Sequence, residues 1–239
     1  MSKVQTMGWV EHDYPNTAAL VANVSALFET ACRDAIGARG HAVLALAGGR
    51  TPLPIYAHLA NAGLGGAIAV IPTDERCVPH AHAACNLRNL RAAFASDADV
   101  HVQAMTTEDG DIAASLTTAC TWLAQHPQPF DAALIGMGGD GHFASLFPGA
   151  ANLAEGLALD RGVDAVATVP NPLPPEAPFA RISLTLPRLL HARAIHVVVT
   201  GEDKRQVLRH AQQHPHCAYP IAALLHAGNA TPIHIHWSP

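Results

Sequence analysis

The sequence predicts an α/β fold: a single-domain, Rossmann-like, mostly parallel sheet with helices on both faces. Three observations support this prediction. The chain of 239 residues is 49% hydrophobic and only 14% charged, which suits one compact domain over residues 1–239 with a large core. Short apolar runs of strand length alternate with helical stretches, as in a sheet covered on both faces. Glycine-rich turns follow several of these runs.

The apolar runs predict the strands of this sheet. They lie at 41–49, 67–72, 130–138, 164–170, 180–186, 195–201 and 232–237. In the last run, Ile233 and Ile235 alternate with His234 and His236. We therefore expect a half-buried strand there rather than a metal site.

Helical stretches separate many of these strands. The first covers residues 16–37, where apolar side chains recur every three or four positions and Gly37 is expected to end the helix. Those apolar side chains are Leu20, Val24, Leu27 and Ala31. Further helices are expected at 52–62, 86–95, 109–125, 203–213 and 219–227. Closely spaced prolines in residues 169–181 exclude a helix and favour an extended loop that leads to Arg181.

Charge and composition exclude several classes of function. The formal net charge is −5 and the 14 lysines and arginines are scattered singly, so we expect no nucleic-acid partner. No apolar run is long enough to span a membrane, and the N-terminus lacks the pattern of a signal peptide. We therefore expect a cytoplasmic protein that does not bind membranes. The five cysteines form no C-x-x-C pair, which favours reduced thiols.

In a parallel α/β sheet, binding sites lie beyond the carboxyl ends of the strands, and four loops qualify. The first contains Gly48, Gly49, Arg50 and Thr51. The glycines allow close backbone approach, and Thr51 is expected to cap the next helix with Pro52 in its first turn. Such a loop can bind a phosphate at the helix N-terminus. An ordinary tight turn is an equally good interpretation of this segment alone.

The second loop begins with Asp74, Glu75 and Arg76 directly after a strand. Arg76 offers a planar fork for a phosphate or carboxylate, and Asp74 is a candidate acid, base or acceptor for a substrate hydroxyl. On this segment alone, a solvated turn with a local ion pair is the simpler interpretation. His80 and His82 follow, but their spacing does not indicate a zinc site. His82 stays a candidate substrate contact.

The third loop lies in LIGMGGDGHFASLFPG, residues 134–149, whose glycines match the G-x-G-x-x-G dinucleotide fingerprint. Asp160 lies at about the distance expected of a ribose-binding acid. However, only the five residues FASLF follow His142 before a proline, too few for the helix that holds a pyrophosphate. The charge of Asp140 would also repel that group. A Walker A loop is excluded because His142 and Phe143 stand where lysine and serine or threonine are required.

This third loop is instead interpreted as a glycine-lined turn that presents Asp140 and His142 at a strand end. Histidine suits proton transfer near neutral pH, and the N–H groups of Gly138, Gly139 and Gly141 are expected to converge on an oxyanion. The alternative is structural: Asp140 would cap a helix, and His142 would serve as a hydrogen-bond donor. The density of glycines, which costs chain entropy, favours the functional interpretation.

The fourth loop begins at Thr200 and Gly201 and leads to Lys204 at a helix start. A lysine there is disfavoured by the helix dipole unless an anion lies nearby, which makes Lys204 a candidate phosphate contact. A solvent-exposed lysine is an equally good explanation. The chain has no G-x-S-x-G or H-E-x-x-H motif, so serine-hydrolase and zinc-peptidase chemistry lack their usual signatures.

Taken together, these motifs resemble those of the 6-phosphogluconolactonase family in order and spacing over nearly the whole chain. They are LAGGRTP, TDERCVPHAHAACN, LIGMGGDGHFASLFPG, the proline-rich run into RISLTL, and TGEDK. The resemblance implies a fold shared with glucosamine-6-phosphate deaminases, one type of ribose-5-phosphate isomerase and coenzyme A transferases. It also implies hydrolysis of 6-phosphoglucono-δ-lactone in the oxidative pentose phosphate pathway, with no metal or other cofactor. The sequence does not show the oligomeric state, for which a monomer is favoured.

The resemblance also implies roles for individual residues. His142 is the implied general base that activates water and then protonates the ring oxygen, with Asp140 orienting it. Asp74 is grouped with these catalytic residues, but its role stays open between binding sugar hydroxyls and bracing Arg76. The residues implied to hold the phosphate or the rest of the substrate are Gly48, Gly49, Arg50, Thr51, Arg76, His82, Asn86, Gly139, Arg181 and Lys204.

Three residues depart from the family pattern, and two other functions are to be weighed. Ala47 and Cys85 replace serines, and Phe143, which either narrows the site or packs inward, replaces a threonine. A glucosamine-6-phosphate deaminase is one alternative, but that family has a glutamate in an F-N-E-P segment where this chain has residues 145–148, SLFP. A non-catalytic sugar-phosphate sensor is the other, but such regulators normally carry a DNA-binding domain, for which the motifs leave no room.

Overall fold

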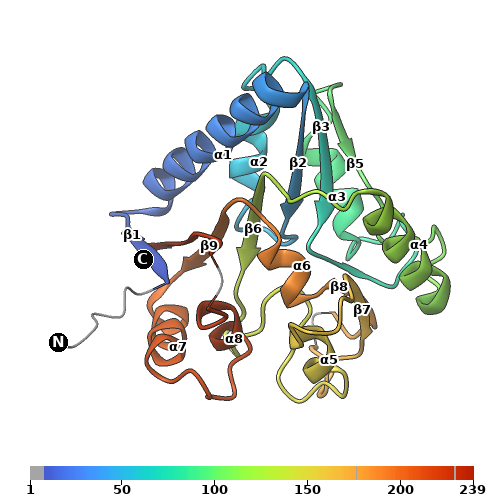
Figure 1. Ribbon diagram of the computed structural model, residues 1–239, viewed down its shortest axis with the longest axis vertical. Coiled ribbons are helices and arrows are strands. Elements are labelled where there is room, and N and C mark those ends of the chain that lie inside the picture. The colour runs from blue at the N-terminus through green and yellow to red at the C-terminus, as the bar shows by residue number, and fades with distance from the viewer. Residues whose placement is uncertain (1–7, 176, 229) are drawn as a thin grey trace.

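The computed structural model of the protein describes residues 8–175, 177–228 and 230–239. Residues 1–7 of the N-terminal stretch in which we expect no signal peptide, and Glu176 of the proline-rich segment, lie outside them. The described chain forms a large sheet with helices on both faces and a smaller sheet beside it (Figure 1). None of the described helices is long and apolar enough to cross a membrane.

The large sheet has seven strands in the order β1-β10-β9-β6-β2-β3-β5, and all neighbouring strands run parallel. Its strands are β1 (Trp9–Asp13), β2 (His41–Leu46), β3 (Ala67–Pro72), β5 (Val100–Val102), β6 (Ala132–Gly136), β9 (Ile195–Thr200) and β10 (Ile233–Ser238). The apolar runs predicted all of them except β1 and β5. These two are the edge strands, which are only partly covered and therefore lack a continuous apolar run.

Alternate residues of β2 show why helices cover both faces of the sheet. Leu44 and Leu46 pack in a hydrophobic cluster with α1, α2 and α3, whereas Val43 and Ala45 pack in a second cluster with α4, α6, α7 and α8. Successive side chains of a strand point to opposite faces, so β2 contributes to both clusters. The helices of the first face are α1 (Thr17–Arg39), α2 (Leu53–Ala60) and α3 (Asn86–Ala93). Those of the second face are α4 (Ile112–Gln125), α6 (Leu186–Leu190), α7 (Glu202–Gln213) and α8 (Ile221–Leu225).

Several predicted helix boundaries are wrong. The helices expected at 109–125 and 219–227 are the shorter α4 and α8, and the predictions for Gly37 and Thr51 also fail. α1 does not end at Gly37, which lies exposed inside the helix; it ends before Gly40, whose left-handed φ of 81° allows its N–H to close the last turn. Thr51 does not cap α2. The chain makes an extra turn after Thr51, so Pro52 stands at the cap position and contributes no side-chain hydrogen bond.

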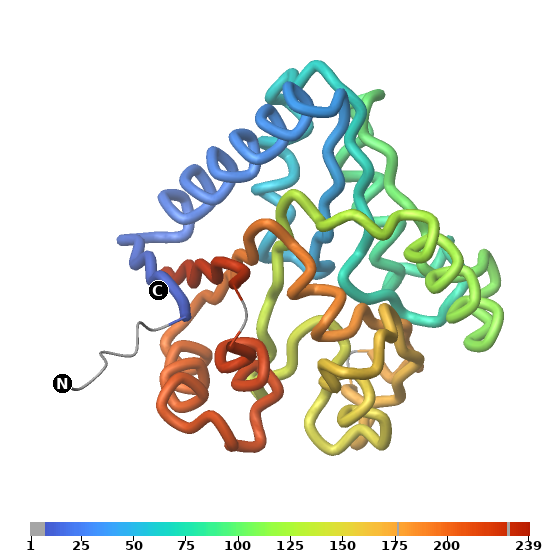
Figure 2. Tube along the Cα trace, viewed as in Figure 1, coloured from blue at the N-terminus to red at the C-terminus, as the bar shows by residue number. Residues whose placement is uncertain are grey.

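A smaller antiparallel sheet lies beside the large one, with the strand order β4-β8-β7. Its strands are β4 (Asp74–Arg76), β7 (Ala165–Thr168) and β8 (Arg181–Leu184), and α5 (Leu153–Leu157) packs on β7. Figure 2 shows this group set apart from the α7 and α8 pair. The apolar runs predicted β7 and β8 as strands but not their separate sheet, and β4 was expected to be a loop. The described residues between β7 and β8 form the expected irregular loop.

The C-terminal strand β10 is more buried than its alternating pattern predicts. The apolar runs did not predict β1. This strand pairs with β10, which is therefore an inner strand, and α1 also packs on β10. His236 is therefore fully buried and hydrogen-bonds to Tyr14 and His196, each at 3.0 Å. Burial lowers the pKa of His196 to about 3 and that of His236 to about 2. Both histidines are thus neutral parts of the core.

The topology of the large sheet places a crevice between β2 and β6. From β2 the sheet continues through β3 to β5, whereas from β6 it continues in the opposite direction through β9 to β10. The loops that leave the carboxyl ends of β2 and β6 therefore diverge. In open parallel sheets, such a point of divergence is where ligands bind.

Candidate active site

A cavity of about 260 Å³ occupies this crevice. It is lined by the loops that follow β2, β3, β6 and β9, together with residues of β4 and β8. All four loops singled out in the sequence therefore meet at one site. The predicted site residues that line the cavity are Gly48, Gly49, Arg50, Thr51, Asp74, Arg76, Asn86, His142, Arg181 and Lys204.

The cavity is electropositive although the whole chain has a formal net charge of −5. Four cationic side chains line it, from Arg50, Arg76, Arg181 and Lys204, against the single carboxylate of Asp74. Local charge rather than net charge determines which ligand a cleft attracts. The cavity therefore suits an anionic ligand.

The pairing of β4 with β8 places two arginines side by side on the cavity wall. Arg76 lies opposite Arg181, and Asp74 lies opposite Ser183. Because side chains alternate along a strand, Asp74 and Arg76 share the face toward the cavity while Glu75 points away. Like charges directly opposite each other destabilise a sheet. An anion bound between the two arginines would relieve that repulsion.

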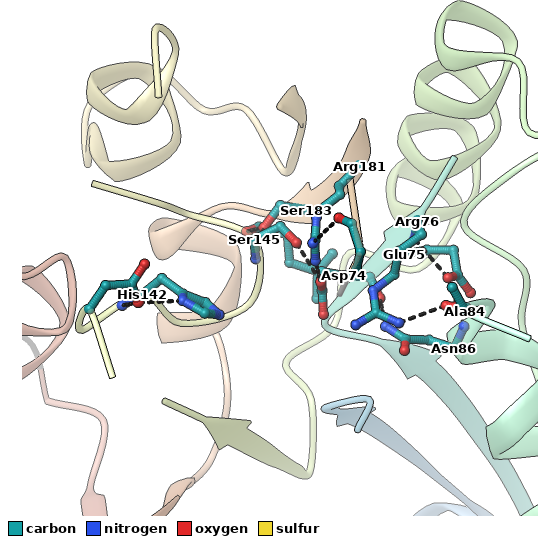
Figure 3. A network of polar contacts seen from close by, with 12 residues as sticks. Asp74, Glu75, Arg76, Ala84, Asn86, His142, Ser145, Arg181 and Ser183 are labelled. Atoms are coloured by element: carbon teal, nitrogen blue, oxygen red, sulfur yellow. Dashed lines mark hydrogen bonds and ion pairs between the residues drawn. The ribbon is translucent and has the colours of Figure 1, made fainter. Parts of the chain in front are cut away.

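Asp74 belongs to a buried polar network that crosses from β4 to the turn after β6 (Figure 3). The hydroxyl of Ser145 donates to Oδ2 of Asp74, and Nη1 of Arg181 lies 3.9 Å from the same oxygen. Burial lowers the pKa of the Arg181 guanidinium, Asp74 raises it and Arg76 lowers it further. Arg76 itself donates from Nη1 to the carbonyl of Ala84 at 2.6 Å. The Asp74 carboxylate thus contacts Ser145 and Arg181, and among the described residues no hydrogen bond or ion pair joins it to Arg76.

Glu75, on the other face of β4, ties this strand to α3. Its fully buried carboxylate accepts the N–H groups of Asn86 at 2.8 Å and Leu87 at 2.6 Å. Burial raises the pKa of Glu75, and these hydrogen bonds oppose the shift. Asn86 in turn donates from Nδ2 to the Asp74 carbonyl at 2.8 Å. Its amide lies so close to the first loop that a Cβ on Gly48 would stand 2.1 Å from Oδ1, so only glycine fits there.

Four buried polar atoms of the cavity lining have no hydrogen-bond partner within the described residues. They are Thr73 Oγ1, Arg76 Nε, Asn86 Oδ1 and Arg181 Nε. Buried polar groups of native proteins are nearly always hydrogen-bonded, so a cluster of unpaired ones calls for an explanation. A polar ligand in this cavity would provide the missing partners.

Asp140 and His142 form a pair at the end of the turn after β6. Oδ1 of Asp140 lies 2.5 Å from Nδ1 of His142 and accepts its backbone N–H at 3.2 Å. Partial burial raises the pKa of Asp140, but the hydrogen bonds and charge of His142 outweigh it, so the pKa is lowered overall. An ionised carboxylate can only accept a hydrogen bond, so Nδ1 carries the proton. In the neutral imidazole Nε2 then carries no proton, which is the form that a general base requires.

The turn itself holds the imidazole in place, but it uses two of the three expected oxyanion donors for its own hydrogen bonds. The N–H of Gly138 donates to the His142 carbonyl at 3.0 Å, and that of Gly141 donates to the Gly138 carbonyl at 3.1 Å. The prediction that these two groups face an oxyanion is therefore wrong, because the turn uses them. A Cβ on Gly138 would lie 2.2 Å from both Nδ1 and Cε1 of His142, so the imidazole packs directly on this glycine.

Three predicted site residues do not line the cavity. Asp140 is hydrogen-bonded to Nδ1 of His142; that it orients His142 for catalysis stays a prediction. His82 accepts the N–H of Ala84 on Nδ1 at 3.1 Å and packs edge-on against Phe179, and Gly139 is exposed. Contact of His82 or Gly139 with a substrate stays a prediction. Among the described residues, no group of three or more His, Cys, Asp or Glu side chains is arranged to hold a metal ion.

Sequence reasoning missed Thr73 and Ser145 as members of the site. Thr73 carried a usable signal, because it stands at a strand end immediately before the charged loop. Ser145 carried none, since its partner Asp74 is 71 residues away and only the tertiary structure brings the two together.

Comparison with known proteins places this chain in a family. A family model described as "Glucosamine-6-phosphate isomerases/6-phosphogluconolactonase" matches residues 15–233. The chain belongs to this family. The 6-phosphogluconolactonase of Pseudomonas putida is 35% identical over 238 residues, which cover 95% of this chain and 92% of that protein. That of Neisseria meningitidis serogroup A is 30% identical over 221 residues, or 91% and 94% of the two chains.

The fold of the family is also known from crystal structures. A 6-phosphogluconolactonase from Shewanella baltica superposes with a TM-score of 0.83 at 30% identity, over 97% of this chain and 98% of that one.

The site geometry explains one departure from the family pattern. Phe143 is fully buried in the hydrophobic cluster that also contains Leu146, so it packs inward and does not narrow the cavity. Ala47 lines the cavity without a hydroxyl, and the Cys85 thiol contacts Glu75 Oε2 at 3.5 Å.

Proposed function

We propose that this protein hydrolyses 6-phospho-D-glucono-1,5-lactone to 6-phospho-D-gluconate. The observation that carries the proposal is the Asp140–His142 pair, whose imidazole lines a cavity with Arg76 and Arg181 on another wall. A base for water and a cationic wall for phosphate are the two elements that this reaction needs. Membership of the family and the names of the relatives agree with this function.

The cationic residues hold the phosphate end of the substrate in this proposal. Arg76 and Arg181 face each other across β4 and β8, and a phosphate between them accepts from both guanidinium groups. Lys204 and the backbone of residues 48–51 complete the phosphate site. Asp74, buried among donors, accepts a hydrogen bond from a sugar hydroxyl. Binding at this remote end positions the lactone carbonyl for attack.

His142 carries the proton transfers. Its Nε2 removes a proton from water as the water oxygen bonds to the lactone carbonyl carbon, which gives a tetrahedral oxyanion. When this intermediate collapses, the bond from that carbon to the ring oxygen breaks, and the imidazolium returns its proton to the ring oxygen. Asp140 keeps Nδ1 as the donor and stabilises the imidazolium. General acid–base assistance of this kind contributes about 10²- to 10⁴-fold in rate.

A coupled assay tests both the function and the role of His142. We expect the purified protein to form phosphogluconate faster than the spontaneous opening of the lactone. We expect His142→Ala to lose about 10²-fold or more of the catalysed rate while binding phosphogluconate as the wild type does. His58→Ala is the matched control, because His58 is an exposed histidine on α2, and this variant keeps full activity.

The possible results of these assays distinguish a wrong function from a wrong assignment of the general base. A wild-type protein that does not exceed the spontaneous rate contradicts the function. Release of ammonia from glucosamine 6-phosphate, assayed in parallel, would favour the deaminase alternative. Full activity of His142→Ala with a catalytic wild type would instead overturn the assignment of the base.

We also propose that residues 1–239 act as one domain, as a monomer and in the cytoplasm. Loops of a single chain line the cavity on several sides, which supports the monomer. Light scattering at assay concentrations tests the monomer, and fractionation of cells tests the location. A dimer by light scattering would contradict this part of the proposal.

A further inference from the structure

Phe147 is a buried aromatic residue that belongs to neither hydrophobic cluster of the described chain. Its side chain is 5% exposed, yet it packs in neither cluster. Its neighbours Phe143 and Leu146 behave differently, since both lie in the cluster on the second face of the sheet. The turn after His142 therefore directs Phe143 and Leu146 into the core, whereas Phe147 lies outside both clusters.

The ring of Phe147 lies between two polar residues of the site. Its centroid is 4.1 Å from that of the His142 imidazole, with the two planes inclined by 30°. The guanidinium carbon of Arg181 lies 4.9 Å from the same centroid. Figure 3 shows His142 and Arg181 on either side of Ser145. Phe147 is thus in contact with the proposed base and with one cation of the opposite wall.

These contacts complement the hydrogen bond from Asp140. That bond holds one atom of the imidazole, Nδ1, and Gly138 packs beside Nδ1 and Cε1. A flat neighbour stacked on the ring limits its remaining rotation, so these contacts together set the direction of Nε2. The face of an aromatic ring also carries negative charge density, which attracts Arg181 and the imidazolium that forms when His142 accepts a proton.

We propose that Phe147 is a positioning residue for the hydrolysis. It fixes the plane of the His142 imidazole and favours its protonated form during turnover, and it holds Arg181 in the same stack. The proposal rests on the proposed function of the site. It differs from a packing role in a specific way: it needs the aromatic ring, and it affects turnover more than product binding.

Three variants test this role. Phe147→Leu keeps an apolar side chain but removes the ring, and Phe147→Tyr restores the ring. Phe94→Leu is the matched control, because Phe94 is 4% exposed and packs against Tyr56 in the cluster on the other face. For each variant, kcat, the Kd for phosphogluconate and Tm are measured. The imidazole NMR signals of His142, identified by their loss in His142→Ala, report its environment without turnover.

The expected result is a split between turnover and binding. Phe147→Leu lowers kcat about tenfold or more, raises the Kd for phosphogluconate by less than about threefold, and shifts the His142 signals. Phe147→Tyr recovers most of kcat. Phe94→Leu lowers Tm about as much as Phe147→Leu does, and it leaves kcat unchanged.

Other results overturn the proposal. One is a kcat of Phe147→Leu within about twofold of wild type. Others are a kcat of Phe147→Tyr as low as that of Phe147→Leu, and His142 signals that Phe147→Leu leaves in place. Failure of the proposed function is recognised separately, because it appears in the wild-type rate, whereas the His142 signals test the contact in either case.

Discussion

The contact between Gly138 and His142 allows a test of whether close packing at residue 138 sets the position of the imidazole. An alanine at position 138 would place its Cβ 2.2 Å from Nδ1 and Cε1 of His142 and 2.7 Å from Oδ1 of Asp140. The backbone does not forbid the change, because Gly138 is not among the residues with positive φ. The effect of Gly138→Ala is therefore confined to the added methyl group and the side chains that it meets.

The size of the effect follows from these distances. Carbon atoms in contact lie about 3.5–4.0 Å apart, so from 2.2 Å the imidazole has to move by roughly 1.3–1.8 Å. That movement also breaks the hydrogen bond between Nδ1 and Asp140. A displacement of about 1 Å in a catalytic group can cost about 10²-fold in rate, or about 2.7 kcal/mol of activation free energy. We expect Gly138→Ala to lower kcat by about 10²-fold.

The assay measures phosphogluconate formation and combines Gly138→Ala with His142→Ala. In the double variant the imidazole is gone, so the methyl group meets only Asp140, which then has no imidazole to orient. Gly138→Ala is then expected to cost about 10²-fold in the wild-type background and nothing measurable in the His142→Ala background. Binding of phosphogluconate and Tm serve as the checks on folding.

Two results would refute this reasoning. Wild-type activity in Gly138→Ala would mean that the turn accommodates the added methyl group without moving the imidazole. An equal loss in both backgrounds would mean that position 138 acts on the reaction by a route other than His142.

The remaining predictions concern stability. His196 and His236, whose pKa values are lowered to about 3 and about 2 chiefly by burial, stay neutral in the folded protein, whereas the unfolded chain takes up protons below about pH 6.5. Stability therefore falls as the pH drops from about 6.5 toward 3, by roughly 2 kcal/mol for each histidine at pH 5; urea unfolding at pH 7.5 and 5.0 checks this, and equal stabilities would contradict it. Phe143→Thr, which restores the usual family residue, removes a fully buried ring and is expected to cost about 3 kcal/mol of unfolding free energy with little change in kcat. A stability change below about 1 kcal/mol, or a large loss of kcat, would show that Phe143 does not act through packing.

Much of the fold follows from local patterns in the sequence. The inner strands of the large sheet are buried on both faces, so each appears in the sequence as an apolar run. Helices alternate with these strands along the chain, which indicates parallel pairing. The edge strands β1 and β5 leave no such run. The antiparallel β4-β8-β7 sheet was also missed, because a strand pattern does not identify the partner of a strand.

The site divides in the same way. Asp140 and His142 are two residues apart, and the glycines beside them set their geometry, so local reasoning found this pair. Local patterns do not show which hydrogen bonds the folded backbone makes. For that reason the number of free N–H groups in that turn was overestimated, and Thr51 was wrongly predicted to cap a helix. The placement of His82 outside the cavity lining was equally invisible, since Phe179 and Ala84 hold it there.

The sequence by itself thus determined the parallel α/β architecture, the loops that meet at the cavity, and the Asp–His pair whose histidine lines it. These features depend on residues that are neighbours along the chain. The tertiary structure alone decided that Arg76 faces Arg181, that Ser145 donates to Asp74, and that Phe147 lies against His142. Cross-strand register and packing across the crevice create the first two contacts, and the third depends on which apolar side chains of one turn the core accepts.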